Sequence, residues 1–142
     1  MATCLNFEDI LEIGHPQLDL LQKVGDSFPT AEAPGAGEAF ARQVRVLEGV
    51  LTQTYAVGVA IARRADDLHE VAHVWEQMGL FCMAAVQRLA QLRHKYPSCG
   101  TSQLFDLSLN YKLACEKRCR SALEEIECQR QEIPTGLFPA QI

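Results

Sequence analysis

Apolar residues recur every three or four positions between Glu38 and Tyr96. Two series with a seven-residue repeat interleave there, one being Leu47, Thr54, Ile61, Leu68, Trp75, Cys82, Leu89 and Tyr96, and the other Val50, Val57, Arg64, Val71, Met78, Ala85 and Leu92. This spacing is typical of an α-helix that buries one side against other helices. We predict that its large apolar members form a partner-binding surface, here called the seam, which comprises Leu47, Val50, Val57, Ile61, Leu68, Val71, Trp75 and Met78.

The repeat keeps its phase from Leu47 to Tyr96, and neither glycine nor proline occurs between Val59 and Met78. These observations favour one continuous helix over 38–96, about 85 Å long at 1.5 Å per residue. The charges of RRADD (63–67) are the evidence against continuity, because basic residues suit the end of one helix and acidic residues the start of the next. A break near 64–67 is therefore the alternative prediction.

Small residues lie beside the seam at the same spacing, namely Gly58, Ala65, Ala72 and Gly79. Side chains at a contact set how closely two helix axes approach, so small ones permit close packing. We predict a close-packing groove along these four residues. The helix expected at 102–131 is the one predicted to lie in it.

Prolines and glycines divide the rest of the chain. Gly14 and Pro16 separate two short helices over 6–24, and DSFPTAEAPGAG (26–37) is predicted to be a flexible linker. The string YPSCG (96–100) precedes a C-terminal helix over 102–131, and Pro134 and Pro139 predict an extended tail over 132–142. No sustained alternation of β-branched residues indicates a strand. The sequence predicts a single all-α domain over 1–142, a helical bundle or coiled-coil-like fold.

The string HEVAH (69–73) resembles the H-E-x-x-H motif of zinc-dependent peptidases. In that family two histidines one helical turn apart bind zinc, and the glutamate activates a water molecule. The resemblance implies His69 and His73 as metal ligands and Glu70 as the general base. It covers five residues of 142, and Glu76 and Gly79 occupy the positions of the glycine and third histidine of the extended motif.

The phase of the seam favours a different interpretation of HEVAH. Because Leu68 and Val71 belong to the seam, His69 and His73 are expected to project away from it, near Asp66 and Glu76. Acid and imidazole groups at such spacings form ordinary surface pairs. We therefore expect no catalytic residue, metal or cofactor, and we keep a zinc-dependent hydrolase only as the alternative.

The net charge of −5 and the pI of about 5.3 indicate no overall basic field that would bind nucleic acid. A local basic cluster (Lys112, Lys117, Arg118 and Arg120) is offset by nearby glutamates, and we interpret it as a mixed, solvated surface rather than an anion site. The start MATCLNFEDIL does not resemble a signal peptide. Unbroken apolar runs such as AVGVAIA (56–62) are far shorter than the ~20 residues that span a bilayer. We expect an intracellular protein of the cytoplasm, the nucleus or both, without membrane insertion and with six reduced cysteines.

The lengths of the predicted elements suggest a function. A continuous seam over 38–96 would be much longer than the helix at 102–131 and the short helices that could cover it. Part of the seam would then need a partner. We therefore expect a non-enzymatic helical interaction protein, a small adaptor or subunit of a larger intracellular assembly, whose partners are other helical proteins or a second copy. A break at 64–67 would instead permit a self-sufficient monomeric bundle that binds a small ligand.

Overall fold

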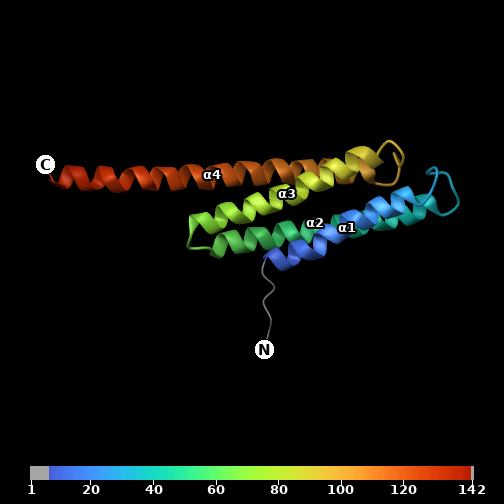
Figure 1. The fold of residues 1–142 in the computed structure, drawn as a ribbon, viewed down its shortest axis with the longest axis horizontal. Coiled ribbons are helices and arrows are strands. Elements are labelled where there is room, and N and C mark those ends of the chain that lie inside the picture. The colour runs from blue at the N-terminus through green and yellow to red at the C-terminus, as the bar shows by residue number, and fades with distance from the viewer. Residues whose placement is uncertain (1–6, 142) are drawn as a thin grey trace, which may run out of the picture.

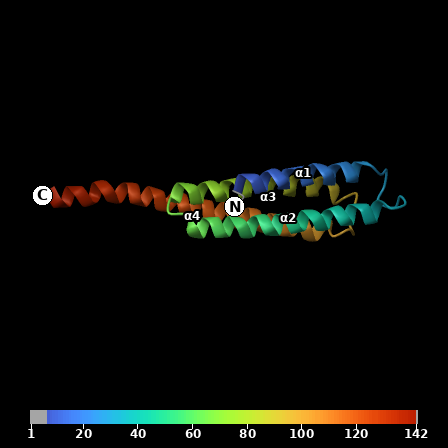
Figure 2. The same ribbon diagram turned by 90° about the horizontal axis from the view of Figure 1, so that it is seen from below.

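The computed structural model describes residues 7–141, with described side chains at 7–9 and 11–131. This part of the chain forms four helices, α1 (Phe7–Asp26), α2 (Ala36–Arg64), α3 (Leu68–Leu92) and α4 (Thr101–Gln141), and contains no strand. Successive helices run in opposite directions along one common axis, as Figures 1 and 2 show. The predicted all-α helical bundle is confirmed.

The favoured prediction of one helix over 38–96 is wrong, and the alternative break near 64–67 is correct. Ala65 and Asp67 adopt extended backbone conformations, and the Asp67 Oδ1 atom accepts a hydrogen bond of 2.9 Å from the His69 backbone N–H. This side-chain cap satisfies a donor that the start of a helix leaves unpaired. Arg63 and Arg64 lie in the last turn of α2, where the helix dipole favours positive charge. Local capping and charge therefore outweigh the absence of glycine and proline.

The buried side of α2 differs from the predicted seam. Its buried residues are Ala36, Phe40, Val44, Leu47, Leu51, Thr54 and Gly58, whereas Val50, Val57 and Ile61 are only partly buried. In α3 the prediction agrees better, since Trp75 and Met78 are buried together with Cys82, Ala85, Leu89 and Leu92. A straight α-helix drifts by about 20° per heptad from a strict seven-residue repeat. The break also means that the phase of α3 does not constrain that of α2.

The predicted pair of short helices over 6–24 is instead one helix, α1, and residue 6 lies outside the described part. Gly14 is buried, and a Cβ atom added to it would lie 2.8 Å from the Phe81 Cζ atom of α3. This glycine therefore permits close helix packing rather than ending a helix. Pro16 is exposed inside α1, where it removes one backbone N–H donor without ending the helix.

The connection expected as a flexible linker over 26–37 packs against the end of the bundle. Tyr96 Oη donates a hydrogen bond of 2.9 Å to the Gly25 carbonyl, and its ring stacks on Phe40 with centroids 3.9 Å apart. Lys95 Nζ donates to the carbonyls of Gly25 and Phe28. These contacts tie both interhelical connections at this end to the core.

The C-terminal helix is longer than the predicted range of 102–131. Its first residue, Thr101, donates an Oγ1 hydrogen bond of 2.7 Å to the Tyr96 carbonyl, and α4 continues to Gln141. The predicted extended tail over 132–142 is therefore wrong for 132–141, and residue 142 lies outside the described part. Proline removes a hydrogen bond and kinks or weakens a helix, but the helix continues through Pro134 and Pro139. Ile126 is the last buried residue among the described side chains of α4, and Figure 1 shows the helix extending beyond the α2–α3 turn.

The length and composition of α2 alone would allow it to cross a membrane, a property that core helices of soluble proteins share. Polar residues interrupt its apolar stretches, so the helix contains no long unbroken apolar run. In this structure α2 contributes Phe40, Leu47 and Leu51 to the core. Its apolar composition is therefore used, at least in part, for packing within the bundle.

Replacement of Asp67 by alanine should destabilise the protein by about 0.5–2 kcal/mol, because the N-terminal turn of α3 loses its side-chain cap. Chemical denaturation measures this change. Asp66→Ala is the matched control, since Asp66 is exposed and does not cap the helix, and its effect should remain within about 0.5 kcal/mol. Equal effects of the two substitutions would contradict the role given to Asp67.

Leu51→Ala should cost about 2–5 kcal/mol, because Leu51 is fully buried and the substitution leaves a cavity. The loss should appear as a lower free energy of unfolding. Val46→Ala, at a position 43% exposed on the same helix, should change it by no more than about 0.5 kcal/mol. A Leu51→Ala variant as stable as Val46→Ala would show that the buried side of α2 is wrongly assigned.

Candidate functional site

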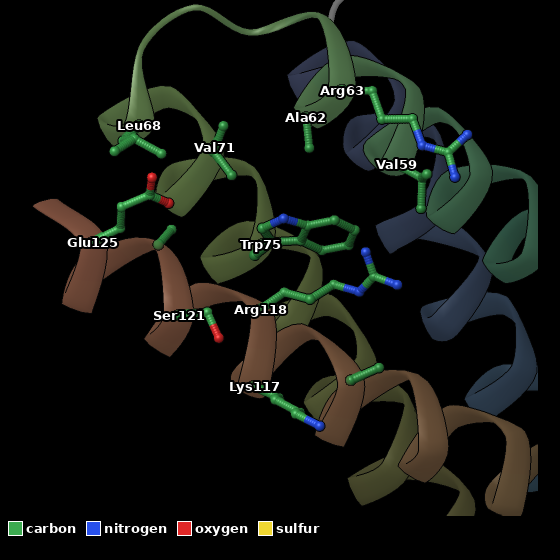
Figure 3. Close-up of a pocket in the computed structure, with 12 residues that line it drawn as sticks. Val59, Ala62, Arg63, Leu68, Val71, Trp75, Lys117, Arg118, Ser121 and Glu125 are labelled. Carbon is green, nitrogen blue, oxygen red and sulfur yellow. The ribbon is translucent and has the colours of Figure 1, made fainter.

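Near the turn that joins α2 to α3, three helices line a cavity of about 590 Å³, here called the cleft. The apolar part of its lining comes from all three helices and comprises Val59, Ala62, Leu68, Val71, Trp75, Ala114 and Ala122. Figure 3 shows Trp75 at the centre, with α2 on one side of it and α4 on the other. The cleft exists because the chain reverses direction at 65–67 and α4 continues past this turn.

The polar lining of the cleft is mostly basic. Arg63 of α2 and Lys117 and Arg118 of α4 contribute three positive charges, and Glu125 contributes the one carboxylate. The Arg118 guanidinium carbon lies 5.0 Å from the centroid of the Trp75 ring, a cation–π contact. Among the described side chains, none of these three basic residues forms an ion pair. The cleft is therefore a local positive region in a chain of net negative charge.

Aromatic contacts hold the floor of the cleft in place. Trp75 is 3% exposed, and its ring centroid lies 5.7 Å from that of Tyr55 on α2. Tyr55 in turn stacks on Tyr111 of α4, with centroids 4.3 Å apart. Such pairs stabilise beyond the area they bury. The three rings connect α2, α3 and α4 next to the cavity.

A second hollow of about 420 Å³ lies between α3 and α4, on the other flank of α4, and is here called the α3–α4 groove. Its apolar border includes Leu80 (56% exposed), Met83 (39%) and Leu123 (54%). Charges of both signs surround it, including the Lys112–Glu116 ion pair at 2.5 Å. Large apolar side chains that cluster on a surface and have a polar rim are typical of interaction sites.

The residues of the predicted seam lie in three different environments: the core, its partly exposed edge and the cleft. Leu47 and Met78 are fully buried in the core, and Val50, Val57 and Ile61 pack against it while partly exposed. Leu68 and Val71 line the cleft together with Trp75. The seam is thus mainly an intrachain packing surface. Since the helix is broken, the length argument that left part of it for a partner no longer holds.

The four small residues do not form one groove. A Cβ atom on Gly58 would lie 3.3 Å from Phe7 Cε1 of α1, and Ala65 lies in the break. Only Ala72 and Gly79 lie against α4: the Ala72 carbonyl accepts a 3.5 Å hydrogen bond from Cys119 Sγ, and a Cβ on Gly79 would lie 3.6 Å from Cys115 Cβ. The predicted groove fails because its members belong to two helices and a turn.

The described cysteines are free thiols, namely Cys82, Cys99, Cys115, Cys119 and Cys128, and Cys4 lies outside the described residues. A hydrogen bond to Cys115, together with burial, raises the pKa of Cys82. Burial is also the main cause that raises the pKa of Cys119, and the negative charge of Glu76 adds to it. Thiols with a raised pKa are poor nucleophiles at neutral pH, so these two groups act as packing residues.

The two histidines of HEVAH lie at the surface near the start of α3. His69 Nδ1 is 3.3 Å from Asp67 Oδ1, and His73 Nε2 is 3.7 Å from Glu8 Oε1 of α1. These acidic neighbours replace the expected Asp66 and Glu76, because the cap of α3 and the position of α1 were not predicted. Glu70 is exposed. Within the described part of the chain, no group of three or more metal-binding side chains is close enough together to hold an ion.

The sequence identified the basic cluster, but it did not indicate that the cluster is divided between two surfaces of α4. Lys117 and Arg118 line the cleft, whereas Lys112 and Arg120 border the α3–α4 groove. The sequence indicates Arg63 only as a residue at the end of a helix, and it predicts no role for Leu80 or Leu123. Helical spacing places Lys117 and Arg118 on a different flank of the helix from Lys112 and Arg120, but only the packed helices show which surface each flank meets.

Comparisons with models of protein families, with curated proteins and with solved structures found no match to this chain. The two hollows are therefore interpreted from their own residues. The cleft combines an apolar floor with unpaired positive charge, and the α3–α4 groove combines exposed apolar side chains with charges of both signs.

Replacement of both His69 and His73 by alanine should change the free energy of unfolding by less than about 0.5 kcal/mol, since both side chains are largely exposed. The zinc content of the purified protein should be the same for the variant and the parent. A bound equivalent of zinc that disappears in the variant would instead support the resemblance to zinc-dependent peptidases.

Proposed function

We propose that this chain is a non-enzymatic helical interaction protein, a small adaptor or subunit of a larger intracellular assembly. Its α3–α4 groove is the proposed binding surface, and an amphipathic helix of another protein is the proposed occupant. The supporting observation is that Leu80, Met83 and Leu123 are all exposed around one hollow. This surface replaces the seam, most of which packs inside the bundle.

The form of the groove suits a helix. It lies between two antiparallel helices, so a third helix can pack along it with apolar residues at i, i+3, i+4 and i+7. Full burial of a leucine or methionine side chain contributes roughly 1.5–3 kcal/mol, so covering the three exposed side chains is a substantial source of affinity. Helix α4 lies close to α3 behind them, since a Cβ atom added to Gly79 would lie 3.6 Å from the Cys115 Cβ atom.

The charges around the groove indicate which charges a partner helix should carry. Glu76 and Glu116 are acidic, and Lys112 and Arg120 are basic. A partner helix with both signs of charge beside its apolar stripe complements this rim, and a strongly acidic or strongly basic helix does not. Such complementarity mainly increases the association rate and the specificity.

Two alternatives to this proposal have less support. A second copy of this chain is a competing occupant of the groove, and sedimentation of the purified protein distinguishes it from a different partner. A zinc-dependent hydrolase would use His69, His73 and Glu70, and no described contact favours that chemistry. We therefore propose no enzymatic activity.

Leu80→Asp combined with Leu123→Asp should abolish partner binding while the bundle remains folded, because both side chains are exposed and a carboxylate in the groove opposes apolar contact. Quantitative affinity capture compares the proteins retained by the variant and by the parent. Leu20→Asp on α1, at a position 42% exposed, is the matched control and should retain the same proteins as the parent. Circular dichroism checks that all the proteins are equally helical.

Identical sets of captured proteins for the two variants would refute the groove as the binding surface. Sedimentation of the parent as a dimer that the Leu80→Asp and Leu123→Asp changes dissociate would replace the proposed partner with a second copy.

A further inference from the structure

The cleft between α2, α3 and α4 shares only Trp75 with the groove of the proposed function and has a different chemistry. We infer that it binds a small amphipathic anion, with a carboxylate or phosphate head held by arginine and an apolar body lying over Trp75. The inference does not depend on the proposed function, because the two surfaces use different flanks of α4.

The cleft has the volume of a small-molecule site, and its apolar floor is held in place by packing. Its volume of about 590 Å³ lies within the roughly 300–1,000 Å³ typical of small-molecule pockets. Leu68, Val71 and Trp75 form its floor on α3, and Val59 forms part of its wall on α2. Contact with Tyr55 fixes the Trp75 ring, so the floor exists before a ligand binds. A ligand therefore needs little reorganisation of the protein.

The charged part of the cleft points to an anionic head. Arg63 and Arg118 lie on opposite walls, and Figure 3 shows Arg118 reaching from α4 past Trp75 toward α2. Neither guanidinium is paired with a carboxylate among the described residues. The Arg118 guanidinium carbon lies 5.0 Å from the Trp75 ring centroid, and no described carboxylate forms an ion pair with Arg118, so its N–H donors are available for an oxyanion.

The positions of the charged residues predict how the ligand is oriented in the cleft. Glu125, the one acidic residue of the lining, lies on the side of the cleft next to Leu68 in Figure 3, away from Arg63. An anionic head at the arginines is therefore distant from this carboxylate, and the apolar body extends over Trp75 and Val71. The α2–α3 turn passes above the labelled Leu68 and Ala62 in the same view.

The experiment compares ligands that share an apolar chain and differ in the head. The full chain is titrated with dodecanoate, dodecyl phosphate, dodecyltrimethylammonium and dodecyl maltoside, each below its critical micelle concentration, and with inorganic phosphate. Isothermal titration calorimetry gives the affinity, and fluorescence of Trp75, the only tryptophan, reports contact with the floor. At least one dodecyl anion should bind saturably, at least about tenfold more tightly than the cationic and neutral compounds, a ratio that corresponds to one or two charge-assisted contacts. The ratio of the two anions identifies the preferred head, and inorganic phosphate alone should bind more weakly than either.

Matched variants locate the binding. Arg63→Gln with Arg118→Gln should weaken binding of the dodecyl anions by roughly tenfold, because each removes one cation that faces the head. Arg120→Gln removes the same charge from the other flank of α4 and should change the affinity by less than about twofold. Both arginines of the cleft are exposed, so the variants should keep the helicity of the parent, and Arg63→Gln alone serves if the double variant does not. Equal binding of the neutral compound, an effect of Arg120→Gln equal to that of the Arg63 and Arg118 double change, or no binding of either anion would overturn the inference.

Discussion

The apolar side of α3 is the surface on which the other three helices pack. Phe81 lies against Gly14 of α1, Trp75 contacts Tyr55 of α2, and Gly79 faces Cys115 of α4. Phe81, Met78, Cys82 and Leu89 have no exposed surface. Burial of this kind is the dominant favourable contribution to folding, and close packing adds dispersion contacts. Glycine at position 14 permits the close approach of Phe81, since an added Cβ atom would lie 2.8 Å from its ring.

The two ends of the bundle differ in how they are closed. At one end Tyr96, Lys95 and Thr101 bond to backbone carbonyls of the connections, and the Tyr96 ring stacks on Phe40. At the other end the short turn at 65–67 joins α2 to α3, and α4 continues past it. The cleft lies at this second end. The hydrogen-bonded connections and the cleft therefore lie at opposite ends of the bundle.

The C-terminal helix α4 packs into the bundle and also contributes residues to both proposed binding sites. Its inner side, which includes Leu104, Cys115 and Ala122, packs into the bundle. One flank supplies Lys117 and Arg118 to the cleft, and the other supplies Lys112, Arg120 and Leu123 to the α3–α4 groove. Trp75 lines both hollows, so the two sites share one fixed side chain. A ligand in the cleft that moved Trp75 would also change the wall of the groove.

The sequence by itself determined the helical class, the buried side of α3 and the surface position of His69 and His73. These follow from local periodicity, which depends only on which residues recur every three or four positions. The sequence did not determine where the chain reverses direction within the long repeat. Two antiparallel helices can keep the same apparent phase, and the Asp67 cap that begins α3 is a local contact of one side chain. Gly14 and Pro16 predicted a helix end, whereas packing of Gly14 against Phe81 keeps α1 continuous. Only the tertiary structure decided that the basic cluster is divided between two hollows, because the surface that each flank of α4 meets depends on the placement of α2 and α3 around it.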